Sequence, residues 1–231
     1  MTKAEINDEV KVPVIAIDGP SASGKGTVAQ AVASELGFHY LDSGALYRLV
    51  ALAALRAGVG DAEALGELAQ RLPAEFRGAE IFLDGERVTD AIRTEEMSAA
   101  SSRVAVIASV RKGLIHRQHA FRRAPGLVAD GRDMGSAVFP DAVLKVFLTA
   151  SAQERANRRY KQLKQKGLSA NLGALLQGIE ERDRRDAARA LAPLQQCADA
   201  HVLDTTTLSI DEAVRKVIQW FHGAARPVPS H

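Results

Sequence analysis

Cysteine is nearly absent from this chain of 231 residues, which contains only Cys197. A single thiol cannot form an internal disulfide, so the sequence excludes a small disulfide-stabilised secreted domain and favours a reducing compartment. The chain also lacks an apolar run long enough to span a membrane, and residues 1–13 lack the apolar stretch of a signal peptide. We therefore expect a cytoplasmic protein with no membrane partner.

Aromatic residues are also scarce, at 5% of the chain, and the formal net charge is only +2. Sites for single-stranded nucleic acid combine basic residues with aromatic stacking surfaces, and no segment of this sequence does so. Residues 151–189 nevertheless contain ten Lys and Arg against five Asp and Glu. Such a stretch either faces small anions or forms a solvated helix face. We expect no nucleic-acid partner and, because there is no heptad run, a monomer.

The hydrophobic residues, 46% of the chain, are distributed as in an α/β fold. Nearly unbroken apolar runs, typical of strands buried on both faces of a parallel sheet, occupy residues 12–18, 126–130, 143–148 and, more briefly, 201–204. Helical patterns lie between these runs, which predicts a doubly wound parallel sheet flanked by helices.

Local signals add two helix starts and one insertion to this fold. Capping boxes of Ser151 with Glu154, and of Ser209 with Glu212, predict that helices begin at these residues. Residues 79–92 break the alternation of strands and helices, because Asp84-Gly85 between two apolar-containing runs indicates a tight hairpin. This segment is predicted to be a small β insertion.

Residues 19–25 match G-x-x-x-x-G-K, and the match lies between a predicted buried strand and a predicted helix, as this phosphate-binding motif requires. Backbone N–H groups of such a loop point at phosphate oxygens, and the lysine reaches the β and γ phosphates. Gly26 stands where a Ser or Thr usually follows the lysine, so we expect Thr27 to supply the hydroxyl for Mg²⁺. The candidate ATP-binding residues are Gly19, Pro20, Ser21, Ala22, Ser23, Gly24, Lys25, Gly26 and Thr27. A non-catalytic regulatory protein that binds nucleotide would carry the same loop.

A second anion site is suggested at residues 41–48, where a short strand ends and a helix begins. Ser43 is placed to cap that helix, and Tyr47 and Arg48 follow one turn later. The guanidinium group of Arg48 matches a phosphate bidentately. The alternative is that Tyr47 packs in the core while Arg48 is solvated.

Two further segments carry charges in patterns that favour a site. Residues 129–135 follow a predicted buried strand, so they should emerge at the carboxyl edge of the sheet, where open α/β folds bind ligands. An ordinary charged loop is the alternative there. On a helix, Arg182, Asp186 and Arg189 would share a face, which either binds an anion or forms internal ion pairs.

The motifs DGPSASGKGT, LDSGALYR, GRDMG and RDRRDAAR together resemble those of the bacterial cytidylate kinases, from about Val14 to Phe221. The resemblance implies a P-loop parallel-sheet core, an acceptor-binding insertion with a small antiparallel β element, and a short helical lid. It places the core at residues 1–42, 98–150 and 186–223, the acceptor-binding (NMP-binding) domain at 43–97 and the lid at 151–185. Residues 224–231 are expected to form a disordered tail.

This resemblance also implies roles for individual residues. The acceptor CMP or dCMP would contact Ser43, Tyr47, Arg48, Ser102, Arg111, Asp130, Gly131, Arg132, Asp133, Asp186 and Arg189. Asp133 would read the cytosine edge, because a carboxylate accepts from the amino group of cytosine, where uracil presents an acceptor instead.

The expected reaction is transfer of the ATP γ-phosphoryl group, with Mg²⁺, to the acceptor phosphate. The residues expected to neutralise the transferring group are Lys25, Arg155, Arg158, Arg159, Arg182 and Arg185. The sequence does not decide which of Arg182, Arg184 and Arg185 contacts that group. A kinase for UMP or shikimate remains the alternative enzyme.

Overall fold

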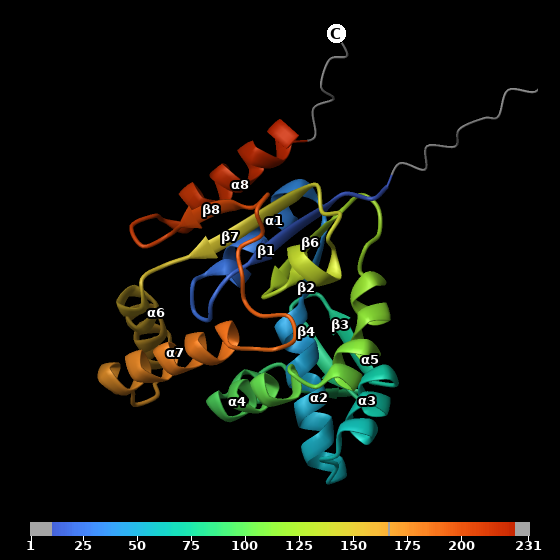
Figure 1. The fold of residues 1–231 in the computed structure, drawn as a ribbon. Coiled ribbons are helices and arrows are strands. Elements are labelled where there is room, and N and C mark those ends of the chain that lie inside the picture. Colours follow the sequence, from blue (N-terminus) through green and yellow to red (C-terminus); the bar gives the residue numbers. More distant parts are fainter. Residues whose placement is uncertain (1–10, 166, 225–231) are drawn as a thin grey trace, which may run out of the picture.

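The structure is a computed structural model that describes residues 11–165 and 167–224. Its centre is a parallel five-stranded sheet in the order β2-β6-β1-β7-β8 (Figure 1). The strands are β1 (Val14–Asp18), β2 (His39–Asp42), β6 (Leu127–Gly131), β7 (Leu144–Thr149) and β8 (His201–Asp204). The predicted α/β class is confirmed, and the four apolar runs correspond to β1, β6, β7 and β8 to within two residues at each end.

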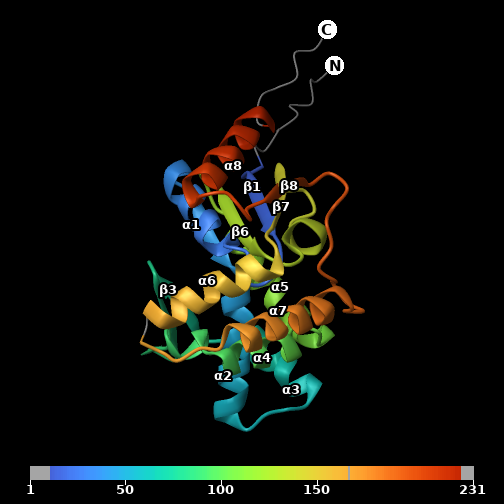
Figure 2. The same ribbon diagram turned by 90° about the vertical axis from the view of Figure 1, so that its left-hand side faces the viewer.

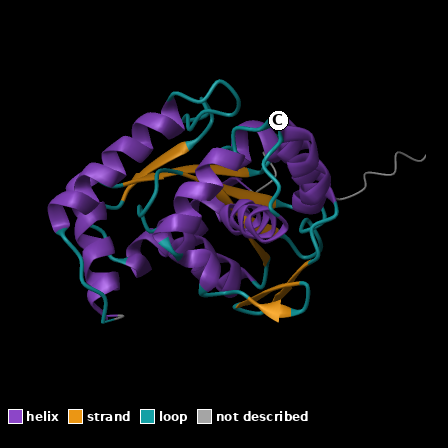
Figure 3. Ribbon diagram, turned by 90° about the horizontal axis from the view of Figure 1, so that it is seen from below, coloured by secondary structure: helices purple, strands orange, loops and turns teal. Residues whose placement is uncertain are grey.

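Helices cover both faces of this sheet (Figure 3). Ile15 and Ile17 of β1 point into one core, which they share with α1 (Lys25–Leu36) and α8 (Ile210–Ala224). Val14 and Ala16 point into the other core, which continues into α2 and α5, described below. Because successive side chains of a strand face opposite sides, a strand buried on both faces reads as one apolar run. That is the pattern by which the sequence predicted β1.

The segment between β2 and β6 lies next to the sheet and contains four of the α-helices (Figure 1). Its elements are α2 (Ser43–Ala57), α3 (Ala62–Gln70), β3 (Ala74–Arg77), β4 (Glu80–Leu83), β5 (Glu86–Arg87), the 3₁₀ turn η1 (Ala91–Arg93), α4 (Glu95–Val104) and α5 (Ala108–His119). The three short strands form an antiparallel sheet in the order β3-β4-β5.

The predicted hairpin is confirmed, because Asp84 and Gly85 join β4 to β5 with φ values of 51° and 78°. Two consecutive positive φ angles are the signature of a tight hairpin turn. The predicted extent of the insertion was wrong, since its first strand starts at Ala74. Only Ala74 and Phe76 of β3 are partly buried, and an alternation over four residues is too short to be distinguished from a helix or a loop.

Two further helices, α6 (Ala152–Gln165) and α7 (Leu172–Ala187), lie side by side between the sheet and α4 (Figure 2). The short π-helix η2 (Met134–Val138) connects β6 to β7.

No helix in the described ranges is both long enough and apolar enough to cross a bilayer. Of the expected tail, Ala224 ends α8 and residues 225–231 lie outside the described part of the chain.

One of the two predicted capping boxes is complete. Ser209 N donates to Glu212 at 2.9 Å and Glu212 N donates to the Ser209 hydroxyl at 3.3 Å. At the start of α6 only Glu154 N donates to Ser151, at 3.2 Å, and the Ser151 N–H donates to Thr206 instead. The carboxylate of Glu154 pairs with Arg158 at 3.0 Å, because a charged donor is a stronger partner than a backbone amide.

Candidate active site

The loop from Gly19 to Gly24 connects the end of β1 to the first turn of α1. It curls tightly, since Ala22 and Gly24 have φ values of 59° and 91°. A Cβ atom at Gly19 would lie 2.0 Å from the carbonyl oxygen of Leu148, so no side chain fits there. The first N–H groups of α1 have no partners within the helix and, with the helix dipole, form a binding site for an anion.

Lys25, which is partly buried, and Asp130, which is buried, lie together beside this loop. The Lys25 ammonium group donates to the Pro20 carbonyl at 3.2 Å and lies 3.9 Å from Asp130 Oδ1. The Tyr40 hydroxyl donates to Asp130 Oδ2 at 3.3 Å. Burial lowers the pKa of Lys25 and raises that of Asp130, while their mutual attraction opposes both shifts. Asp130, which was expected to contact the acceptor, therefore lies against the donor loop.

The position of Asp130 also explains why Gly26 follows the lysine. A Cβ atom at Gly26 would lie 3.0 Å from Asp130 Oδ2 and 3.6 Å from the Tyr40 hydroxyl. A serine or threonine there would crowd the carboxylate, which leaves the hydroxyl of Thr27, one residue later, as the one that follows the lysine. The unusual G-K-G-T order is thus a packing consequence of the acid on β6.

The residues near Thr27 fit a magnesium ion. Asp130 Oδ1 is buried and makes no hydrogen bond within the described residues, and Thr27 lines the same cavity. Mg²⁺ is usually held by one or two protein oxygens together with substrate phosphates and water. The described residues contain no cluster of three or more His, Cys, Asp or Glu, and a magnesium ion held partly by substrate phosphates does not need such a cluster.

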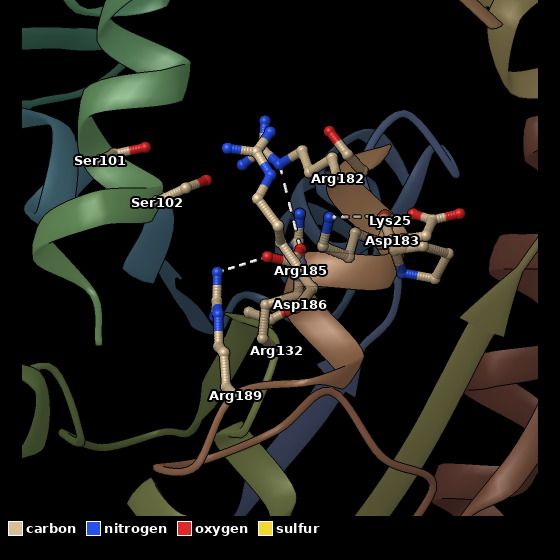
Figure 4. A network of polar contacts seen from close by, with 12 residues as sticks. Lys25, Ser101, Ser102, Arg132, Arg182, Asp183, Arg185, Asp186 and Arg189 are labelled. Carbon is tan, nitrogen blue, oxygen red and sulfur yellow. Dashed lines mark hydrogen bonds and ion pairs between the residues drawn. The ribbon is translucent and has the colours of Figure 1, made fainter. Parts of the chain in front are cut away.

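A cluster of arginines surrounds the buried carboxylate of Asp186, which has 0% exposure (Figure 4). Arg132 Nε donates to Asp186 at 2.9 Å, Arg189 forms a second pair, and Arg182 Nε lies 3.9 Å away. Burial opposes ionisation of Asp186, but the arginines outweigh it and lower its pKa. Burial and the nearby Arg132 lower the pKa of Arg182 to about 10, so it stays charged at neutral pH.

Arg48 on α2 points toward the same cluster. Its Nε atom is buried and has no hydrogen-bond partner within the described residues, which leaves a donor for a ligand. Tyr47 is only 6% exposed, so it packs in the core. The prediction that Ser43 caps α2 was wrong, because Asp42 is the N-cap and accepts from Ala45 N at 2.9 Å.

A polar pocket next to this cluster contains Asp133, Arg111, Tyr47 and Ser102. Asp133 is 4% exposed and pairs with Arg111, whose Nη1 also lies 3.3 Å from the Tyr47 hydroxyl. Ser102 on α4 donates to the Ser98 carbonyl at 3.3 Å. Gly131 leaves room for Ser43, since a Cβ atom there would lie 2.7 Å from the Ser43 hydroxyl. This pocket presents both a carboxylate acceptor and a guanidinium donor.

One cavity of about 1940 Å³ connects the donor loop, the arginine cluster and the polar pocket. The predicted residues that line it are Ser21, Ala22, Gly24, Lys25, Gly26, Thr27, Ser43, Tyr47, Arg48, Ser102, Arg111, Asp130, Gly131, Arg132, Asp133, Arg158, Arg159, Arg182, Arg185 and Arg189. The predicted residues that do not line it are Gly19, Pro20, Ser23, Arg155 and Asp186. Residues that lie far apart in the sequence therefore meet in one place.

Comparison with known proteins agrees with the motifs. The family model for cytidylate kinase matches residues 15–223. Cytidylate kinase from Paraburkholderia phymatum is 59% identical over 213 residues, covering 91% of this chain and 93% of that protein. Cytidylate kinase from Chromobacterium violaceum is 59% identical over 212 residues, covering 91% and 96%. The chain belongs to the cytidylate kinase family. The resemblance inferred from the sequence is confirmed.

Within this member of the cytidylate kinase family, two basic residues of α6, Arg155 and Arg158, contact the donor loop. Arg155 donates to the Ser21 carbonyl at 3.2 Å and forms a bidentate pair with Asp183. Arg158 donates to the Ser23 carbonyl at 2.9 Å and to Thr205 at 3.1 Å. Their guanidinium groups thus hold the donor loop from outside, although both were expected to contact the transferring phosphate.

The other basic residues of the α6–α7 pair differ in where they point. Arg159 donates to Glu95 of α4 at 2.8 Å, and Arg182 donates to the Ser98 hydroxyl, so both reach across the cavity. Arg184 and Arg185 are exposed, and Arg185 Nε donates to the Glu181 carbonyl at 3.4 Å. Of the three arginines that the sequence left undecided, Arg182 is the one next to Lys25, Arg132 and Arg48.

Proposed function

We propose that this kinase transfers the γ-phosphoryl group of ATP to CMP or dCMP, giving ADP and CDP or dCDP. The observation that carries the proposal is the cavity that joins Lys25 and the donor loop to the arginines around Asp186. The polar pocket at Asp133 supplies an acceptor for the amino group of cytosine. Membership of the cytidylate kinase family supports the same acceptor.

The mechanism requires no general base, because an acceptor phosphate oxygen is already ionised near neutral pH. The protein must bring two polyanions together in line and neutralise the charge that spreads over the transferring group. Lys25 holds the β and γ phosphates of the donor. Arg48, Arg132 and Arg189 hold the acceptor phosphate, and Arg182, whose charge acts on both Lys25 and Arg132, neutralises the group in transit.

Thr27 and Asp130 would hold Mg²⁺ together with the donor phosphates. When bound, the ion neutralises negative charge on the β and γ oxygens. Tyr40 orients the Asp130 carboxylate toward this position through the 3.3 Å hydrogen bond. Asp186 has 0% exposure and does not line the cavity, so it acts on the acceptor by orienting Arg132 and Arg189.

We further propose that residues 43–97 act as the acceptor-binding domain and residues 151–185 as a lid on the core formed by 1–42, 98–150 and 186–223. The pairs Arg159–Glu95 and Arg182–Ser98 support a lid that contacts the acceptor side above the site. Closure excludes water, which would otherwise accept the phosphoryl group. We propose that the enzyme acts as a cytoplasmic monomer without a membrane or nucleic-acid partner.

The decisive experiment is a coupled assay of ADP formation with ATP, Mg²⁺ and a panel of acceptors comprising CMP, dCMP, UMP and shikimate. ADP formation that depends on CMP or dCMP is expected. Equal or faster turnover with UMP or shikimate would contradict the proposed acceptor. ATP binding without turnover on any acceptor would indicate a regulatory nucleotide-binding protein.

Arg48→Ala is expected to raise the KM for CMP by roughly tenfold to a hundredfold, the value of one or two hydrogen bonds to a charged group. The KM for ATP should change by less than about twofold, because Arg48 lies on the acceptor side. Arg56→Ala is the matched control, since Arg56 lies on the same helix but pairs with Glu86 at the surface. Steady-state kinetics with each substrate varied will measure the split, and a loss confined to ATP would overturn the assignment.

Asp133→Ala is expected to reduce the preference for CMP over UMP, because the variant lacks the carboxylate that accepts from the amino group of cytosine. The ratio of the kcat/KM values for the two acceptors should fall by on the order of tenfold. Asp141→Ala is the matched control, since Asp141 also pairs with an arginine, Arg122, but lies outside the cavity. An unchanged ratio would remove Asp133 from base recognition.

A further inference from the structure

Asp18 is a buried acid to which the proposed mechanism gives no role. It ends β1, directly before Gly19 of the donor loop, and is 6% exposed. Its two carboxylate oxygens accept hydrogen bonds from Met134 N and Gly135 N, each at 2.8 Å. These two N–H groups begin η2 and directly follow Asp133. One side chain therefore connects the donor loop to the segment that carries the candidate base-recognition residue.

The first turn of η2 has an unusual cap. Asp133 occupies the N-cap position, where an aspartate normally accepts from the N–H groups of its own helix. Here the Asp133 side chain makes no such bond and instead pairs with Arg111 in the polar pocket. A capping side chain accepts from the second or third N–H group of its helix. The second, that of Gly135, is bonded to Asp18 instead, and Asp18 also binds the first, that of Met134. Asp18 thus caps the first turn of η2, while the Asp133 side chain stays in the polar pocket with Arg111.

This arrangement carries an energetic cost, which argues against a passive role for Asp18. Burial raises the pKa of Asp18 to about 7, although the two backbone donors favour its charged form, and Asp133 and Asp130 lie nearby. A neutral residue at the same place would avoid the cost of burying an acid. A neutral side chain, however, would not offer two acceptor oxygens to two adjacent N–H groups.

We infer that Asp18 is a positioning residue that caps η2 in place of Asp133 and thereby keeps the Asp133 carboxylate turned toward the acceptor base. This inference rests on the proposed function, because it concerns the recognition of CMP. Without the Asp18 carboxylate, the free N–H groups of η2 attract the Asp133 side chain back to its own helix. Asp133 then leaves Arg111 and the base pocket, while the donor loop keeps its backbone.

The inference is tested with Asp18→Asn, which has nearly the same shape but presents an amide N–H to one of the two donors. We expect the preference for CMP over UMP, measured as the ratio of kcat/KM values, to fall by on the order of tenfold. The dissociation constant for ATP, measured by calorimetry, should stay within about twofold of the wild-type value. Adding Asp133→Ala to this variant should reduce the ratio little further, because both changes remove the same contact.

Asp61→Asn is the matched control, because Asp61 also accepts a backbone N–H, that of Ala64 at 2.9 Å, but caps the exposed start of α3. Asparagine is an equally good N-cap, so this variant should behave as the wild type. Wild-type selectivity in Asp18→Asn, or equal losses for CMP and ATP, would overturn the inference. So would additive effects in the double variant.

Two further measurements keep these outcomes separate. Hydrogen exchange at residues 134–138 of the ligand-free protein should accelerate in Asp18→Asn but not in Asp61→Asn. If the wild type fails to phosphorylate CMP, the proposed function is wrong. In that case, accelerated exchange in Asp18→Asn still supports the role of Asp18 as the cap of η2, and unchanged exchange overturns that role. If Asp18→Asn does not fold, Asp18→Glu takes its place, since it displaces the two acceptor oxygens by one methylene. This variant should also lose preference for CMP over UMP while its dissociation constant for ATP stays near the wild-type value.

Discussion

Arg182→Ala is expected to lower the kcat for phosphorylation of CMP by on the order of a thousandfold, the lower end of what an arginine finger contributes. The side chain lies near both Lys25 of the donor loop and Arg132 of the arginine cluster, and its Nε has no hydrogen-bond partner within the described residues. Its nearest carboxylate, Asp186, is 3.9 Å away and is already paired with Arg132 and Arg189. Three arginines thus share one acid, and the surplus positive charge is available to the transferring phosphoryl group.

The effect should appear in kcat with little change in the KM for ATP, because charge on the transferring group develops in the transition state. Arg184→Ala is the matched control, since Arg184 lies two residues away on α7 but is exposed. Single-turnover kinetics separate the chemical step from product release. A comparable loss in Arg184→Ala, or a change confined to the KM for CMP, would contradict this role for Arg182.

The features that the sequence predicts well are those encoded by a local pattern. The donor loop follows from seven consecutive residues, and β1 follows from an apolar run that is needed wherever both faces of a strand are covered. The hairpin turn at Asp84-Gly85 is also local, because two positive φ angles require particular residues. Each of these signals is complete within a few residues of chain.

The sequence could not predict which arginines face the cavity, because that depends on the packing of α6 and α7. Arg155 and Arg182 are the same residue type, yet Asp183 and a loop carbonyl hold the first while the second lines the cavity. The cap of α2 was mispredicted for a related reason. Asp42 and Ser43 are both good capping residues, and the choice is made where β2 stops pairing with β6, at Asp42 opposite Asp130.

The role of Asp18 was equally hidden from the sequence. Its partners Met134 and Gly135 lie more than a hundred residues away along the chain, and the bonds involve their backbone N–H groups, which carry no sequence signal. The only available hint was an acid at the end of an otherwise apolar strand. An acid at that position is costly unless it has partners, which is a reason to look for them.

Asp186→Asn is expected to lower the free energy of unfolding by about 3 to 5 kcal/mol, the range for breaking one side of a buried ion pair. The substitution keeps the shape of the side chain but leaves Arg132, Arg189 and Arg182 without a counter-charge at a site with 0% exposure. The folded-state pKa of Asp186 is lowered, so its contribution is complete above its ordinary value of 3.8 and is lost as the pH falls through the lowered folded value. Acid should therefore destabilise the wild type more than the variant.

The distinguishing result is recovery by an anion. Inorganic phosphate or CMP replaces the missing negative charge, so either ligand should raise the stability of Asp186→Asn by more than it raises that of the wild type. Asp183→Asn is the matched control, because Asp183 lies on the same helix and pairs with Arg155, whose guanidinium is held by the donor-loop carbonyl of Ser21. That variant should lose stability without a larger response to phosphate. Urea unfolding with and without phosphate measures both effects, and equal responses in the two variants would show that the arginines around Asp186 do not form an anion site.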